Sequence, residues 1–346
     1  MVGDRKLRIL AAVVDEYIRT GEPVSSKAIA GRPGMKVSSA TIRNDMAALE
    51  ADGYLEQPHT SAGRIPTYAG YKLYIERLMP ERMLSDEEIK MLDDALDDSN
   101  PSEDALIESA SKALAEITNC AAFSNISPKY SVITKVDAIP TGKRIYVLLM
   151  ITSSGNIRNK VCRLEFDLSN EQLGFFTEYM TKHLSGISVD SLSDDMLKEL
   201  AAAMGAYTVT LSPLLGAVGE LAKSFNRSDV KISGEKNLLQ RTDIDAQEIV
   251  KFLEQRNELA QLLDDGFSGL RVLFGSDSVV ISNSSLLVAP IKKGERTAGT
   301  LSLVGPLRLD YAKIIPYLEY LTDRISSILT ENSEEYRLIT IDQETK

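Results

Sequence analysis

Residues 38–66 read SSATIRNDMAALEADGYLEQPHTSAGRIP and carry three successive structural signals. Apolar residues recur at helical spacing from Ser38 to Ala51, which predicts an amphipathic helix. The core-facing positions are Ile42, Met46 and Leu49. Tyr54 to Gln57 is typical of a short strand, and the Gly-, Pro- and Ser-rich residues 58–66 predict a loop that returns into a second short strand.

Two further helical patterns precede this stretch. Leu7 to Ile18 has apolar residues at helical spacing, and Ser25 to Ala30 fits a short helix with Ser25 as N-cap, ended by residues 31–34 (GRPG). Three helices within about fifty residues, the last two joined by a short turn, predict a helix-turn-helix. The hairpin after the third helix indicates the winged form of this motif.

The outward face of the third helix carries residue types that recognise bases. Arg43 can bond guanine and Asn44 can bond adenine, each through two hydrogen bonds, and small alanines allow close approach to a groove. Ordinary solvated helix residues are the alternative interpretation. The DNA-contacting residues that we predict in or just before this helix are Lys36, Ser38, Ser39, Thr41, Arg43 and Asn44.

The hairpin loop adds polar donors at its tip. His59, Thr60, Ser61 and Arg64 are the predicted DNA contacts here, and Ala62-Gly63 would let the backbone come close to a phosphate or a groove wall. Arg64 is the candidate for insertion into the minor groove. Its alternative is a turn residue that packs back on its own domain.

Charge is unevenly distributed along the 346 residues. The chain has 39 Lys+Arg and 50 Asp+Glu, a net charge of −11, but residues 1–80 have 11 against 9, a net of +2. The remaining residues have 28 against 41, a net of −13, and residues 81–104 hold ten acids against two bases. A phosphate-binding surface is therefore expected in the first 80 residues, with a boundary after Pro80.

Several classes of protein are excluded by what the sequence lacks. It contains none of the motifs GxxxxGK[ST], GxGxxG, HExxH, GxSxG or CxxC, and its only histidines are His59 and His183. We therefore predict no catalytic residues, no metal and no cofactor. The two cysteines, Cys120 and Cys162, exclude a disulfide framework, and the amino terminus shows no signal for export, so a cytoplasmic protein is expected.

The rest of the chain mixes strands and helices. Three strands are predicted within residues 131–166, helices within 170–226 that are broken at Gly186 and Ser212-Pro213, and a helix from Asp245 to Asp265. More strands are predicted within residues 270–309, including Val279-Val280-Ile281, and a helix at Pro316 to Leu329. This order predicts a multidomain α+β protein whose sheet domain carries an insertion.

Four stretches resemble the HrcA-type heat-inducible transcription repressors of bacteria. They are residues 10–21 (LAAVVDEYIRTG), 22–28 (EPVSSKA), 37–53 (VSSATIRNDMAALEADG) and 54–74 (YLEQPHTSAGRIPTYAGYKLY). The fourth is a long and specific match, and the remaining segments follow in the family's order and length.

The resemblance implies a winged-helix domain at 1–80, an acidic helical linker at 81–104, a GAF-like domain at 105–150 and 231–346, and an inserted dimerisation domain at 151–230. It further implies a homodimeric repressor of heat-shock chaperone operons that binds an inverted-repeat operator in double-stranded DNA and whose activity the chaperonin modulates. We place the dimer interface mainly in residues 170–226, although the stripe there could equally be internal core. The stripe consists of Leu192, Met196, Leu197, Leu200, Ala203 and Met204.

Two other functions compete with this one. A winged-helix regulator whose GAF-like domain senses a small metabolite would show ligand-dependent operator affinity, although nothing in the sequence marks a ligand and an empty or filled pocket is expected. An enzyme that uses the winged helix for protein contacts would bind DNA regardless of Arg43 and Asn44.

Overall fold

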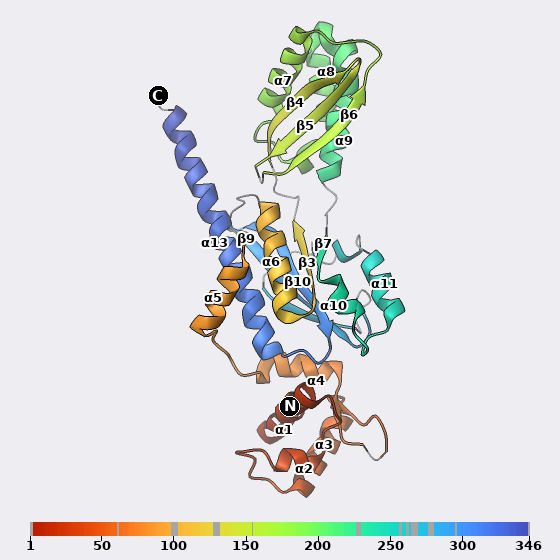
Figure 1. The fold of residues 1–346 in the computed structure, drawn as a ribbon, viewed down its shortest axis with the longest axis vertical. Coiled ribbons are helices and arrows are strands. Elements are labelled where there is room, and N and C mark those ends of the chain that lie inside the picture. Colours follow the sequence, from red (N-terminus) through yellow and green to blue (C-terminus); the bar gives the residue numbers. More distant parts are fainter. Residues whose placement is uncertain are drawn as a thin grey trace.

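The computed structural model describes residues 3–60, 62–97, 103–126, 132–153, 155–225, 230–255, 258–260, 263, 269–275, 280–294 and 296–344. Three bodies follow one another along the long axis of the molecule (Figure 1). The amino-terminal helices lie at one end, a five-stranded sheet with its helices lies in the middle, and a smaller sheet with three helices lies at the other end. The predicted mixture of helices and sheets is thus confirmed.

The first body is the helix-turn-helix with its hairpin. It consists of α1 (Asp4–Thr20), α2 (Ser26–Ala30), α3 (Ser39–Ala51), β1 (Leu55–Glu56) and β2 (Ile65–Pro66). Ser25 caps α2 through its side chain, as the sequence predicts, and Ser38 caps α3 in the same way. The chain leaves through α4 (Tyr68–Leu73), capped by Thr67, which continues into a π-helical turn, η1 (Tyr74–Leu78).

The acidic linker forms α5 (Asp86–Ala95), which begins with a capping box formed by Ser85 and Glu88. Its acids bind the carboxy-terminal helix α13 (Tyr311–Glu344): the Tyr317 hydroxyl donates to Glu88 at 2.6 Å and the Tyr320 hydroxyl to Asp93 at 2.8 Å. Hydrogen bonds from Tyr317, the Ser85 backbone and Arg82 lower the pKa of Glu88 to about 2. The linker is therefore packed on the central body.

The central sheet has the strand order β7-β3-β10-β9-β8, with every neighbouring pair antiparallel. Its strands are β3 (Ala121–Ile126), β7 (Lys231–Ser233), β8 (Arg271–Phe274), β9 (Ser284–Lys293) and β10 (Arg296–Pro306). Helices α6 (Glu103–Thr118) and α13 pack on one face, and α10 (Glu235–Leu239) and α11 (Ala246–Glu254) share a core with the other. The sequence analysis missed β3, because a central strand that is buried on both faces has no polar–apolar alternation.

The third body begins earlier than predicted. Strands β4 (Ile133–Gly142) and β5 (Ile145–Thr152) pair with β6 (Ile157–Arg163) in a separate sheet, and share one core with α7 (Asn170–Leu184), α8 (Asp194–Ala203) and α9 (Thr208–Phe225). Placing residues up to 150 in the central domain is therefore wrong. The chain leaves the central sheet after β3 and returns at β7, which pairs with β3.

Two local predictions also fail. Pro213 lies inside α9 without ending it, because only one helical hydrogen bond is lost and the residue four before it, Val209, is 81% exposed, so its carbonyl lies near solvent. Of Val279-Val280-Ile281, the first residue lies outside the described part, and Val280 and Ile281 are buried in a loop.

Candidate nucleic-acid interface

Helix α3 presents the predicted outward face. Ile42, Met46 and Leu49 are buried, whereas Arg43 and Asn44 are exposed. Ala40 and Ala47 are exposed beside them, so that small side chains flank the two polar ones. The helix can therefore approach a groove with Arg43 and Asn44 leading.

The residues at the start of α3 have structural partners. The Ser38 hydroxyl accepts a hydrogen bond from the Thr41 backbone at 3.2 Å and lies 2.9 Å from the Thr41 hydroxyl. Ser38 is exposed, whereas Ser39 and Thr41 are partly buried. These hydroxyls fix the helix start, and Lys36, just before it, is exposed.

The acids of α3 and its C-cap are paired with bases from other segments. Asp45 is 5% exposed and accepts two hydrogen bonds from Arg5, at 2.7 and 3.0 Å. Glu50 pairs with Arg64 at 2.8 Å, and Asp52 lies 3.8 Å from Lys6. The pairing lowers the pKa of Asp45 through the Arg5 hydrogen bond, against its burial. The sequence analysis missed Arg5 as a partner because it is 40 residues away.

Lys36, just before α3, and Arg43, on its outward face, are exposed bases. Within the described residues, no ion pair involves Lys36 or Arg43. The acids Asp45 and Glu50 of the helix are therefore neutralised by ion pairs, whereas the positive charge of Arg43 on the outward face is not. This arrangement suits a polyanion such as DNA.

The hairpin tip is organised by a residue that the sequence analysis passed over. The Gln57 side chain donates to the Thr60 carbonyl at 3.0 Å and to the Ala62 carbonyl at 2.9 Å, which fixes the loop from within. His59 and Thr60 are exposed at the tip, and Ser61 lies outside the described residues. A glutamine just after a strand is the only sequence signal for this role.

Arg64 packs back on its own domain, which is the alternative to insertion into the minor groove. Its Nε donates to Glu50 at 2.9 Å, and its side chain is only 19% exposed. Its backbone exchanges two 2.9 Å hydrogen bonds with Val24, which joins the hairpin to the segment before α2. In this structure the guanidinium therefore positions α3 and the hairpin, and it does not extend from the tip.

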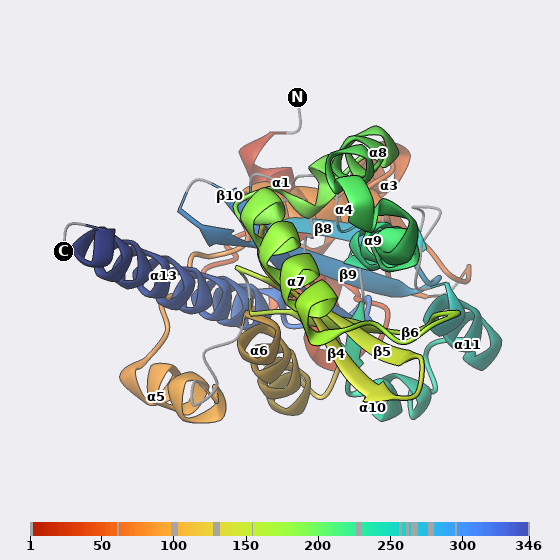
Figure 2. The same cartoon turned by 90° about the horizontal axis from the view of Figure 1, so that it is seen from above.

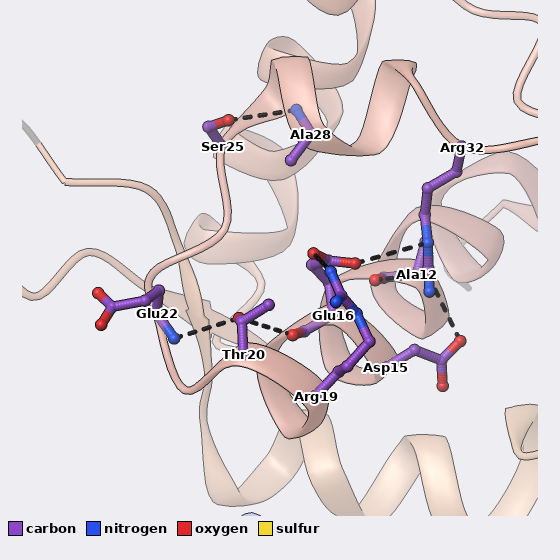
Figure 3. A network of polar contacts seen from close by, with 9 residues as sticks. All are labelled: Ala12, Asp15, Glu16, Arg19, Thr20, Glu22, Ser25, Ala28 and Arg32. Carbon is purple, nitrogen blue, oxygen red and sulfur yellow. Dashed lines mark hydrogen bonds and ion pairs between the residues drawn. The ribbon is translucent and has the colours of Figure 1, made fainter.

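The turn between α2 and α3 is held by Arg32. Its guanidinium donates to the Ala12 carbonyl at 2.8 Å and lies 3.6 Å from Asp15 and 3.9 Å from Glu16 (Figure 3). Arg32 was predicted only as part of a helix-breaking turn. It connects that turn to α1 and so orients α3.

Other chemistry finds little support in the described residues. Within them, no group of three His, Cys, Asp or Glu side chains is placed to hold a metal ion. No single described helix is long and apolar enough to cross a membrane; only the bent pair Asp194–Ala203 and Gly205–Phe225 passes that test.

A winged helix-turn-helix whose recognition helix exposes Arg43 and Asn44, joined to larger α+β bodies, defines a DNA-binding transcription regulator. Comparison with known proteins gives the same class. Residues 104–315 match the family model of the HrcA protein C-terminal domain. A solved structure of a hypothetical protein has a TM-score of 0.65 at 23% identity, covering 96% of this chain and 99% of that chain, which shows a shared fold.

Named relatives extend the match over nearly the whole chain. The heat-inducible transcription repressor HrcA of Acetivibrio thermocellus is 31% identical over 332 residues, 93% of this chain and 95% of that protein. The protein of the same name from Clostridium perfringens is 31% identical over 337 residues, 95% of this chain and 99% of its own length. The chain therefore belongs to the HrcA family of heat-inducible transcription repressors.

Proposed function

We propose that this repressor acts as a homodimer that binds an inverted-repeat operator in double-stranded DNA upstream of chaperone genes. The proposal is carried by one observation on α3: Arg43 and Asn44 are exposed, whereas the acids Asp45 and Glu50 of the same helix are paired with Arg5 and Arg64. Arg43 and Asn44 contact base edges in the major groove, and Lys36 contacts phosphate. His59, Thr60 and Ser61 contact the adjacent backbone or minor groove, and Ser38, Ser39, Thr41 and Arg64 hold the two elements in position.

The open side of the β4-β5-β6 sheet supports dimerisation. Helices α7, α8 and α9 lie on one side of this sheet and leave the other side bare (Figure 2). The apolar residues on that side form what we call the open face: Ile139, Ile145, Val147, Leu149, Ile151, Ile157 and Val161. By register, Lys135, Asp137, Asn159 and Arg163 lie on the same side and border them. Val147 pairs across the strands with both Ile139 and Val161, so these side chains are neighbours.

Exposure distinguishes the open face from ordinary surface. Ile157 is 59% exposed and Val161 is 64% exposed. An exposed apolar cluster bordered by polar residues is typical of an interface, and a two-fold pairing of two such faces is self-complementary. We place the dimer interface on the open face instead of in residues 170–226, because Leu197, Leu200 and Met204 of the stripe belong to the core.

A two-fold dimer presents two α3 helices and therefore requires two inverted half-sites. Modulation of this activity by the chaperonin is the further part of the proposal, and it rests on family membership. A metabolite-sensing regulator is the second candidate, because a cavity lies next to the winged helix.

Fluorescence anisotropy tests the proposal. The full chain is titrated against a duplex carrying an inverted repeat from upstream of a chaperone operon of the same organism, and against a scrambled duplex, at several salt concentrations, with and without chaperonin. We expect tight binding to the repeat alone, steeply weakened by salt and strengthened by chaperonin. Equal weak binding to both duplexes would overturn the operator proposal, and no effect of chaperonin would overturn its modulatory role.

A further inference from the structure

A cavity of ≈ 700 Å³ lies where the winged helix meets the central body. Its walls come from the end of α4 with η1, from the edge strand β8, and from the first turns of α13. Much of the lining is apolar and includes Ile75, Met79, Phe274 and Ile315. The operator proposal gives this cavity no role.

The polar groups that α13 contributes to the cavity are acceptors. Ala312, Pro316 and Glu319 follow one another at helical spacing and all line the cavity. Because proline has no N–H, the Ala312 carbonyl lacks its usual helical donor. Glu319 is exposed at the rim of the cavity, and within the described residues no ion pair involves it. Partial desolvation and the nearby Asp323 charge raise its pKa.

Three bases also line the cavity, Lys72, Arg82 and Arg271, and in the part of the chain that the structure describes no ion pair joins any of them to the Glu319 carboxylate. Arg82 donates to Glu88 at 2.6 Å and is neutralised there, and Arg271 has contacts of its own. Lys72 and Glu76, one helical turn apart, carry opposite charges on the wall formed by α4 and η1. An apolar interior with two acceptors on one wall suits a ligand with a hydrocarbon body and a hydrogen-bond-donating cationic head.

We propose that this cavity binds a small aliphatic ammonium compound, with its ammonium group on the Glu319 carboxylate and the Ala312 carbonyl and its hydrocarbon body against Ile75, Met79 and Phe274. The charge on the ligand is the specific part of the assignment. A neutral or anionic compound of the same length would lose the contact with Glu319.

Phe274 connects this cavity to the orientation of the winged helix. Its ring stacks on Tyr68 with centroids 5.8 Å apart and lies 6.2 Å from Tyr71, which in turn lies 5.9 Å from Tyr311. The Asn283 backbone also donates to the Tyr68 hydroxyl at 3.2 Å. A ligand on Phe274 therefore touches the aromatic joint between the DNA-binding and central bodies, and its binding changes operator affinity. This regulatory step rests on the proposed function.

Isothermal titration calorimetry on the full chain tests the site without DNA. The probes are n-hexylamine, hexanoate and hexanol, equal in chain length and different in head group. We expect n-hexylamine to bind, with hexanoate and hexanol each about tenfold weaker or worse. Failure of n-hexylamine to bind, or equal binding of all three probes, would overturn the ammonium site.

Variants locate the site. Glu319→Gln keeps the side-chain shape and should weaken n-hexylamine about tenfold, whereas Glu331→Gln, an exposed glutamate on the same helix, should leave its affinity unchanged. Ala312→Leu should weaken binding by placing a larger side chain in the cavity wall one helical turn from Pro316, with the melting temperature checking that the fold survives. Unchanged affinity in Glu319→Gln would overturn the assignment.

The regulatory step has its own readout. Operator anisotropy with and without saturating n-hexylamine should differ, and by linkage the operator should change the probe's affinity by the same factor. Equal operator affinity in both conditions would overturn the coupling between ligand and operator, but not the ammonium site itself. If the protein recognised no operator at all, the proposed function would be overturned. The ammonium site would still stand, because its calorimetric test contains no DNA.

Discussion

At the scale of single residues, ion pairs decide which charges of α3 reach the surface. Neighbouring polar residues of the helix differ in burial: Asn44 is exposed, whereas Asp45 is buried and pairs with Arg5. Arg43 and Lys36 stay exposed. The chemistry of the surface thus depends on partners located in α1 and the hairpin.

Arg43→Ala tests base recognition. If Arg43 contacts guanine, the variant should lose about 1–3 kcal/mol of binding free energy on the operator and much less on random DNA. Anisotropy with both duplexes measures this, and Arg77→Ala, an exposed arginine in η1, is the matched control. Equal losses on both duplexes would assign Arg43 to phosphate.

Lys36→Ala tests the electrostatic contribution. Because a phosphate contact carries no sequence information, binding to operator and to random DNA should weaken alike, and the salt slope should fall by about 1. The slope comes from affinities at several salt concentrations. An unchanged slope would contradict a phosphate contact.

Arg5→Gln tests the exposed partner of the buried Asp45. The pair lowers the pKa of Asp45 in the folded state, so its stabilisation is fully present above the ordinary carboxyl pKa and is lost as pH falls through the lowered value. We expect the variant to be less stable than the wild type at pH 7, with a smaller difference in acid. Urea unfolding across pH measures this.

Arg19→Gln is the control for that experiment. Arg19 pairs with Glu16 on an exposed surface, where such pairs contribute roughly 0–1 kcal/mol. A loss in Arg5→Gln that was the same at every pH would contradict the role of the Asp45 charge.

At the scale of secondary-structure elements, the hairpin depends on one close approach. A Cβ on Gly63 would lie 2.3 Å from the Val24 carbonyl oxygen, so only glycine allows the hairpin to bond the segment before α2. The sequence analysis assigned this glycine to an approach to DNA. Its observed neighbour is the protein's own backbone.

Gly63→Ala should therefore displace the hairpin. We expect a loss of about 1–3 kcal/mol of stability and weaker operator binding, because the backbone of Val24 cannot yield like a flexible side chain. Gly31→Ala is the control, since its nearest atoms would lie at an ordinary 3.7 Å. Thermal melting and anisotropy measure both effects, and a wild-type melting temperature in Gly63→Ala would contradict the packing argument.

At the scale of the whole molecule, the arrangement of three bodies separates DNA binding from the proposed dimerisation. The winged helix and the open face lie at opposite ends of the long axis (Figure 1). The long central body and α13 lie between them. The spacing of the two α3 helices in a dimer therefore depends on the joints between bodies, above all on the aromatic joint at Phe274.

Val161→Glu tests the interface. A charge on the edge strand β6 of the open face should convert dimers to monomers and weaken operator binding, because burying an unpaired carboxylate is costly. Multi-angle light scattering measures the mass. Val209→Glu is a matched control, since Val209 is 81% exposed on α9, away from the open face. If Val209→Glu dissociated the dimer and Val161→Glu did not, the interface would instead lie in residues 170–226.

Periodicity and caps along the chain were enough to predict α1, α2, α3 and the hairpin, together with Arg43 and Asn44 on the outward face. These features are local: each depends on residues within a few turns of one another. The Ser25 cap and the three strands within residues 131–166, which are β4, β5 and β6, could be predicted for the same reason.

Tertiary structure decided what depends on distant residues. The pairing of Arg5 with Asp45, the turn of Arg64 toward Glu50, and the membership of β4 and β5 in the third body each involve partners that no local pattern specifies. Burial on both faces concealed β3, and the cavity beside Phe274 exists only because three separate segments meet there. Local sequence fixes which elements form, whereas long-range packing fixes which side chains remain available for function.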